Sequence, residues 1–278
     1  MQPAQGEARA PWRASLPMYN LPEMRDVNAA FWEALRRELA RRGIEDVAPA
    51  LDFDRKPVPA EIERDILFTQ VCGYPLQTIY RGQAVLLGAP VYAVEHCEGP
   101  THTGIFIVHR DSGYARLADL RGCRFVFNSI HSNSGMSLPR RAIADIAGGA
   151  PFFGRVAETH SQPGNIERIA RGEADATCVD CVTYAFFCRH RPALGALTRV
   201  LAATPPSPSI PFVTSPATPP DRRAQLRAAL LAVARSPEWK EARVDLMLKD
   251  IVPIEPESYA VQLHYEREAA ELGYPELK

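Results

Sequence analysis

Short apolar strands alternate with helical segments along most of the chain, and this alternation limits the possible folds more than any other feature of the sequence. The clearest strand is Gly104–His109, and further strands are predicted at 66–70, 84–87, 124–127 and 174–179. Apolar residues recur at helical spacing in 27–42, 166–171, 182–190 and 222–235. The pattern predicts an α/β fold whose mixed sheets are mostly parallel and flanked by helices.

The chain is long enough for two lobes, and its charge excludes several kinds of partner. It has 278 residues and a net charge of −1, with 32 basic and 33 acidic residues. No basic run indicates a nucleic-acid partner, and no apolar run of about 20 residues indicates membrane insertion. The segment 1–11 lacks the apolar core of a signal peptide, which indicates a cytoplasmic protein or a missing leader.

The six cysteines are too few for a disulfide scaffold, and most are expected to be reduced core residues. Cys178 and Cys181 form a C-x-x-C pair that, with Cys188 and His190, could be a zinc or redox site. Because Cys178 falls inside a predicted strand, packing is the favoured interpretation. Cys72 is an alternative nucleophile without a supporting motif. Neither a metal nor a cofactor is predicted.

The loop 128–136 carries the strongest chemical signal. It follows a strand, precedes a helix and contains Ser132, Asn133, Ser134 and Gly135. A helix N-terminus offers unpaired N–H groups, to which hydroxyl and amide donors are added here. The loop therefore predicts an oxyanion cradle, although a serine there could simply cap the helix. Pro139 suggests that the helix begins near Ser137.

Several motifs in order resemble the phosphate-, phosphite- and phosphonate-binding proteins of ABC importers. They include Leu-Pro-Met-Tyr at 16–19, Gln-Val-Cys-Gly-Tyr-Pro at 70–75, the loop 128–135, Thr-His-Ser at 159–161 and Asp-Cys-Val-Thr-Tyr at 180–184. The resemblance extends over nearly the whole chain from about residue 15. It implies a type II periplasmic-binding-protein fold, in which two lobes joined by two crossover strands hold a ligand in the cleft between them.

The resemblance also implies which residues contact the ligand. Ser132, Asn133, Ser134 and Gly135 would hold the oxyanion, and Asp180 would contact a hydroxyl or amine of the ligand while also serving as a helix cap. The remaining candidates lie on turns that would face the cleft: Tyr74 as a phenol donor, Tyr92 as a second aromatic wall, Tyr19, His131 and His160.

We therefore expect lobe 1 to comprise 14–104 and 212–278, and lobe 2 to comprise 105–211. A proline-rich connector at 201–220 would contain the second crossover at 210–214, and the tail after Glu238 is predicted to be helical. The predicted function is capture of a small oxyanion without turnover, as a monomer that delivers to an ABC permease. The resemblance implies a periplasmic location. A cytoplasmic enzyme or ligand sensor on the same fold is the alternative.

Overall fold

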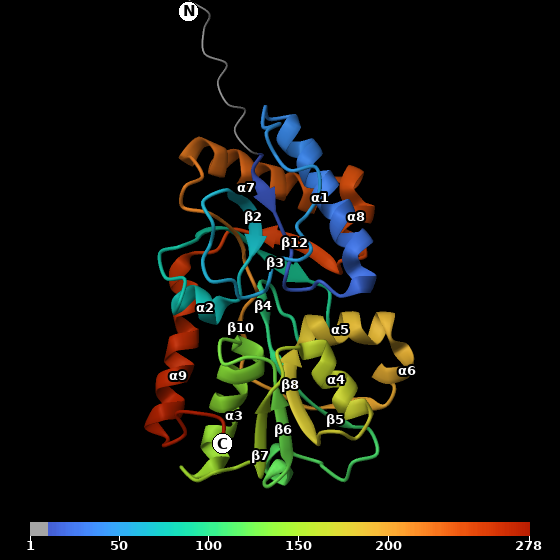
Figure 1. The fold of residues 1–278 in the computed structure, drawn as a ribbon, viewed down its shortest axis with the longest axis vertical. Coiled ribbons are helices and arrows are strands. Elements are labelled where there is room, and N and C mark those ends of the chain that lie inside the picture. The colour runs from blue at the N-terminus through green and yellow to red at the C-terminus, as the bar shows by residue number, and fades with distance from the viewer. Residues whose placement is uncertain (1–10) are drawn as a thin grey trace, which may run out of the picture.

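The protein consists of two α/β lobes stacked along its long axis (Figure 1). The structure is a computed structural model that describes residues 11–278. Of the segment 1–11, in which no signal peptide is recognised, only Pro11 is among the described residues. In the part described, no helix is both long and apolar enough to span a bilayer.

The first lobe is built on a five-stranded sheet. Its strands, in spatial order, are β1 (Arg13–Ala14), β2 (Ile66–Gln70), β11 (Phe212–Thr214), β3 (Val85–Tyr92) and β12 (Leu248–Val252). The helices α1 (Arg25–Ala40), α7 (Pro220–Arg235) and α8 (Lys240–Val244) pack together in this lobe, whereas α2 (Gly73–Gln77) begins just after β2. Phe31 of α1 stacks on Phe212, and Phe212 stacks on Phe68 of β2.

The second lobe is built on another five-stranded sheet with helices on both faces. Its strands, in spatial order, are β7 (Arg155–Glu158), β6 (Arg124–Phe127), β8 (Ala176–Asp180), β5 (Gly104–His109) and β9 (Thr198–Ala203). Ile105 and Ile107 of β5 belong to the core with α4 (Gln162–Ala170) and α5 (Cys181–His190), which leads to α6 (Pro192–Gly195). Phe106 and Val108 belong to the core with α3 (Leu138–Ala147). The alternation of β5 residues between two cores follows from the two-residue period of a strand.

A short antiparallel ladder lies between the two sheets. It pairs β4 (Thr101–His102) with β10 (Ser207–Pro208), so the chain crosses between the lobes twice at the same place. Short 3-10 turns complete the chain: η1 (Pro22–Met24), η2 (Leu117–Leu120), η4 (Pro237–Trp239) and η5 (Pro256–Ala260).

The last helix, α9 (Val261–Glu271), makes a further connection between the lobes. It contacts α2 of the first lobe and α3 of the second, and it runs alongside both in Figure 1. Arg141 of α3 donates to Glu268 at 2.8 Å, and the backbone N–H of Phe152 donates to the carbonyl of Lys278 at 2.6 Å. The C-terminal segment is therefore attached to the second lobe as well as the first.

The α/β class and the mixed sheets are as predicted, but parallel pairings do not dominate. In the first sheet, β11 is antiparallel to both of its neighbours, and in the second sheet β5 is also antiparallel to both. Both strands follow a crossover and run away from the space between the lobes, whereas β2, β6 and β8 end there. A strand that enters a lobe from the crossover must oppose the strands that end at it.

Most predicted strands and helices are present within a few residues of their expected ends, and β2, β5 and β6 match the predicted ranges. The predicted strand 84–87 is longer, because β3 continues to Tyr92 beside β12. The prediction that the tail after Glu238 is helical missed β12. Lys249 and Asp250 interrupt the apolar run by which a strand is recognised in the sequence. The strand forms nevertheless, because its backbone N–H and C=O groups pair with those of β3.

Candidate functional site

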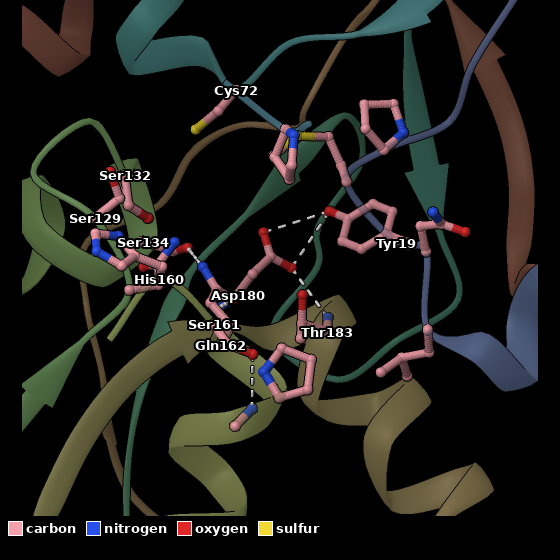
Figure 2. A pocket seen from close by; sticks show the side chains of 18 of the residues that line it. Tyr19, Cys72, Ser129, Ser132, Ser134, His160, Ser161, Gln162, Asp180 and Thr183 are labelled. Atoms are coloured by element: carbon pink, nitrogen blue, oxygen red, sulfur yellow. Dashed lines mark hydrogen bonds between the residues drawn. The ribbon is translucent and has the colours of Figure 1, made fainter. Parts of the chain in front are cut away.

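A cavity of about 410 Å³ opens between the two lobes (Figure 2). Lobe 1 contributes the loop 17–22 and Cys72, which follows β2. Lobe 2 contributes residues at the carboxyl ends of β6, β7 and β8 and at the starts of the helices that follow. Ligand sites of α/β sheets form at these strand ends, and the volume lies within the range of small-molecule sites.

Four serine hydroxyls line this cavity, and each accepts one N–H group. Ser129 accepts from the backbone of His131 at 3.1 Å, and Ser132 accepts from the backbone of Gly135 at 3.0 Å. Ser134 accepts from the Gln162 side chain at 3.0 Å, and Ser161 accepts from the backbone of Gly164 at 3.0 Å. Within residues 11–278 none of these hydroxyls has a protein acceptor for its own proton. The four oxygens are therefore anchored as acceptors, and their protons remain available to an anion.

The interpretation that a serine of the loop 128–136 caps a helical turn is confirmed. Ser132 caps a π-helical turn, η3 (Asn133–Ser137), that runs directly into α3. The α-helix itself begins at Leu138 with Ser137 as its N-cap, so the predicted start near Ser137 is confirmed, and the π-helical turn precedes it. The longer π-helical hydrogen bond from Leu138 to Asn133 brings the chain into α3 just before Pro139, which lacks an N–H group. Because Ser132 also lines the cavity, its cap role and a ligand role are compatible.

Gln162 connects the serine loop to Asp180 at the end of β8. Its side-chain oxygen accepts the Asp180 backbone N–H at 2.9 Å, while its nitrogen donates to Ser134. Both hydrogen-bonding ends of the amide are thus used, and this fixes the orientation of the Ser134 hydroxyl. Gln162 also lines the cavity.

Asp180 forms the floor of the cavity and is almost completely buried. Its carboxylate caps α5 by accepting the N–H groups of Val182 at 2.8 Å and Thr183 at 3.3 Å, and it accepts the Tyr19 hydroxyl of the opposite lobe at 3.3 Å. It also pairs with Nδ1 of His102 in the crossover strand β4. Three parts of the chain, both lobes and the crossover, therefore meet at one carboxylate.

The Asp180 charge changes the titration of its neighbours. Burial lowers the pKa of His102, but the charge of Asp180 and the hydrogen bond to it outweigh burial, and the net pKa is raised. Burial, together with Asp180, raises the pKa of Tyr19 well above its ordinary value. The carboxylate thus favours the protonated form of both neighbours, the His102 ring and the Tyr19 phenol.

Cys72 lies where the N-terminal ends of α2 and η3 approach each other. The backbone N–H groups of Asn133 and Tyr74 face its sulfur, and burial raises the pKa of its thiol to about 11. A thiol with that pKa is protonated at neutral pH and is a poor nucleophile. The geometry therefore gives no support to the alternative in which Cys72 attacks a substrate.

The charged groups at the rim of the cavity are paired with one another. Arg191 donates to Glu23 of lobe 1 at 2.7 and 3.2 Å and to Glu167 of lobe 2 at 2.5 Å. Its guanidinium group is therefore occupied by two carboxylates. His160 is exposed at the mouth, with its Nδ1 3.6 Å from Glu158, and His131 also lines the cavity.

The structure brings together six of the residues predicted to contact a ligand and places four elsewhere. Those at the cavity are Tyr19, His131, Ser132, Ser134, His160 and Asp180. The Asn133 side chain is buried and donates to Ser207 at 2.7 Å, and a Cβ atom at Gly135 would lie 1.9 Å from Oδ1 of Asn128. The glycine thus makes room for Asn128 and not for a ligand.

The two remaining tyrosines also point away from the cavity. Tyr74 donates to Glu266 of α9 at 3.0 Å, and burial raises its pKa. Tyr92 is buried behind Tyr19, with the two ring centres 5.6 Å apart in an edge-to-face arrangement. It supports the ring that reaches Asp180 without lining the cavity itself.

Sequence reasoning missed several polar cavity residues and the buried partner of Asp180. Ser129, Ser161, Gln162 and Thr183 line the cavity, and His102 lies behind it. Ser161 belongs to the Thr-His-Ser motif at 159–161 and could have been recognised as the N-cap of α4. Nothing in the sequence links Gln162 or His102 to Asp180, because these contacts depend on the packing of distant segments.

Residues 76–259 match the protein family described as the periplasmic substrate-binding protein of phosphonate ABC transporters. This region covers more than half of the chain. No curated protein matches the sequence significantly.

Solved structures with the same fold cover nearly all of the chain at low identity. A binding-protein component of an ABC phosphonate transporter from Pseudomonas aeruginosa superposes with a TM-score of 0.74 at 14% identity, covering 94% of this chain and 86% of that one. PhnD1 from Prochlorococcus marinus, in complex with methylphosphonate, gives 0.70 at 15% identity, covering 94% and 99%. A protein from Xanthomonas citri bound to ATP gives 0.62 at 17% identity, covering 94% and 97%.

Proposed function

Because the chain belongs to the family of phosphonate periplasmic substrate-binding proteins of ABC transporters, we propose that its interlobe cavity captures a small phosphorus oxyanion: phosphate, phosphite or a phosphonate. The observation that carries this proposal is the set of four serine hydroxyls, each anchored by an N–H group and each with its proton available. Hydrogen bonds to a charged group contribute about 1.5–3 kcal/mol each, so several of them are enough for specific binding.

The charges around the cavity favour an anion that is held by neutral donors. Arg191 is paired with two carboxylates, Glu23 and Glu167, which offset its charge. Asp180 would repel a fully deprotonated anion, but in place of its long contact with Tyr19, at 3.3 Å, it can accept a hydrogen bond from a protonated ligand oxygen or a hydroxyl. Phosphate and phosphonates carry such a proton near neutral pH, whereas sulfate does not. Selection against sulfate follows from this difference.

The same geometry supports binding without turnover. The Cys72 thiol is protonated at neutral pH, and the Asp180 carboxylate is occupied by the α5 N–H groups, Tyr19 and His102. Neither group is poised as a nucleophile or a general base. Since members of this family are transport components, the partner we propose for this chain is an ABC permease. We also propose that the protein acts as a monomer.

The moving units we propose are lobe 1, comprising 14–104 and 212–278, and lobe 2, comprising 105–211; within the first unit, α9 and the residues after it also contact lobe 2. Tyr19 and Cys72 come from one unit, whereas the serines, Gln162 and Asp180 come from the other. A ligand in the cavity would contact both units only when they are close together. Binding would therefore shift a hinge equilibrium toward the closed arrangement.

Thermal unfolding with a panel of anions tests the proposal. The panel contains methylphosphonate, phosphite, phosphate, sulfate and a carboxylate of similar size. A ligand at 100 times its dissociation constant adds about 2.7 kcal/mol, which corresponds to a rise in Tm of about 5–10 °C for a chain of this size. Stabilisation by a carboxylate or an aromatic acid, and by no phosphorus compound, would favour the enzyme or sensor alternative.

Serine variants then test the site. We expect Ser134→Ala to weaken binding of the stabilising anion by about 1–3 kcal/mol, measured by calorimetry, because one charged hydrogen bond is lost. Ser258→Ala is the matched control, since Ser258 is exposed on η5 and does not line the cavity. Equal affinities for the two variants would contradict the serine site.

A further inference from the structure

Two cysteine thiols from different lobes face each other beside the crossover. The Sγ atoms of Cys97 and Cys181 are 3.5 Å apart. Cys97 lies in the loop between β3 and β4, whose start is attached to lobe 1 by the hydrogen bond from Ala93 to Met247. Cys181 is the first residue of α5 in lobe 2, and its backbone N–H donates to Thr103. No other pair of cysteine sulfurs is in contact in the described part of the chain.

We propose that Cys97 and Cys181 are a redox-reactive pair that forms a disulfide between the two lobes. A disulfide has an S–S length of about 2.05 Å, so the sulfurs need to approach by about 1.5 Å, which is within the reach of side-chain rotation. The thiols belong to residues 84 positions apart, so the bond would close a long loop that includes most of lobe 2.

The exposure of the two residues sets the order of the reaction. Cys97 is partly exposed, whereas Cys181 is buried. The contact with Cys97, and then burial, raises the pKa of Cys181, which disfavours its thiolate. Cys97 is therefore the sulfur that meets an external oxidant, and Cys181 is the resolving thiol.

The oxidant is a small disulfide, RSSR. The Cys97 thiol loses its proton and attacks one sulfur of RSSR, which breaks that S–S bond, forms a mixed disulfide and releases one RSH. Cys181 then loses its proton and attacks the Cys97 sulfur, which forms the Cys97–Cys181 bond and releases the second RSH. Two protein thiols are oxidised and one RSSR is reduced to two RSH, so atoms and electrons balance.

The bond would act on the site through the residue next to it. Cys181 directly follows Asp180, whose carboxylate joins Tyr19 of lobe 1 to lobe 2. Linking Cys181 to the lobe 1 loop would hold this contact in the closed arrangement and slow ligand exchange. This consequence rests on the proposed function, but formation of the disulfide does not.

Alkylation and intact-mass measurement test the pair in the full chain. The protein is incubated with oxidised or reduced glutathione, quenched, denatured and alkylated with a maleimide. We expect the oxidised wild type to carry two fewer maleimide groups than the reduced protein, and a digest to yield a cross-linked peptide containing Cys97 and Cys181. The digest of oxidised Cys97→Ser should contain no such cross-linked peptide. Cys188→Ser is the matched control, because Cys188 is also partly exposed but contacts no second thiol, and it should behave as wild type.

The results distinguish formation of the disulfide from its effect on ligand exchange. Full alkylation of oxidised wild type, or a cross-link between other cysteines, overturns the proposed pair. Cys97 lies in a loop, so its serine variant suffices if Cys181→Ser does not fold.

The effect on the site is measured with methylphosphonate as the probe. We expect the rate of methylphosphonate release to be about tenfold lower in the oxidised wild type than in the reduced protein. In Cys97→Ser, oxidation should leave this rate unchanged. Equal rates despite a formed disulfide overturn the effect on exchange, whereas absence of binding in both states counts against the proposed function and leaves the disulfide result standing.

Discussion

Replacing Asp180 by asparagine isolates the charge at the meeting point of the two lobes. Asparagine caps a helix about as well as aspartate, so the bonds to Val182 and Thr183 should be retained. The variant loses the ionic part of the pair with His102, and the Tyr19 hydroxyl then donates to a neutral oxygen. The loss of one charged hydrogen bond predicts a destabilisation of about 1.5–3 kcal/mol at slightly acidic pH.

The sign of the pH dependence makes this prediction specific. Burial alone lowers the pKa of His102, but Asp180 raises it above its unfolded value of about 6.5. In the wild type this pair therefore stabilises the fold fully below about pH 6.5, and the contribution is lost as pH rises through the raised pKa. In Asp180→Asn burial, the largest influence on the imidazole, is no longer offset by Asp180, so we expect the folded pKa to lie below the unfolded one and stability to be lost as pH falls.

Urea unfolding at a series of pH values measures the difference. The two proteins should differ most near about pH 6 and least near about pH 9, because His102 is neutral in both at high pH. All other histidines are common to the two proteins, so their contributions cancel in the comparison. A difference that stays constant across this range, or that grows with pH, would refute the charged His102–Asp180 pair.

Three further changes test the rim, the loop and the tyrosine placement. Glu23→Gln removes the carboxylate of lobe 1 that pairs with Arg191 of lobe 2, so ligand affinity measured by calorimetry should fall by up to about fivefold at low salt and by less at high salt. Gly135→Ala should lower stability by about 1–3 kcal/mol in urea unfolding, because its Cβ would lie 1.9 Å from Asn128, and the added change Asn128→Ala should restore part of the loss. Tyr92→Phe should leave ligand affinity within about twofold by calorimetry, since Tyr92 lies behind the cavity wall; a loss comparable to that of a serine variant would contradict this position.

The local parts of the fold and site were predictable from the sequence. Apolar runs with clear turn residues on both sides predict β2, β5 and β6 at their observed ranges. The serine loop was recognisable because its donors are close in sequence and precede a helix. Asp180 was recognisable as a cap for the same reason, since its side chain accepts the N–H groups two and three residues later.

The parts that depend on distant packing were not predictable. Tyr74 has the expected position after β2, but its hydroxyl is drawn to Glu266, which is 192 residues away. The contact of Gln162 with Ser134 joins segments 28 residues apart that no motif connects. The strand β12 becomes evident only when β3 is placed beside it. In each case the residues can be read from the sequence, but which of them become neighbours is decided only by the packing of distant segments.

The attachment of α9 to both lobes has a mechanical consequence. Two crossover strands that lie side by side, such as β4 and β10, offer little resistance when one lobe bends or twists relative to the other. A third attachment away from them removes the twist and leaves a single axis of rotation. Because α9 and α6 lie on opposite sides of the molecule in Figure 1, the opening should be widest at the α6 side. A pair of fluorescent labels placed across that side would report the motion with the largest change in separation.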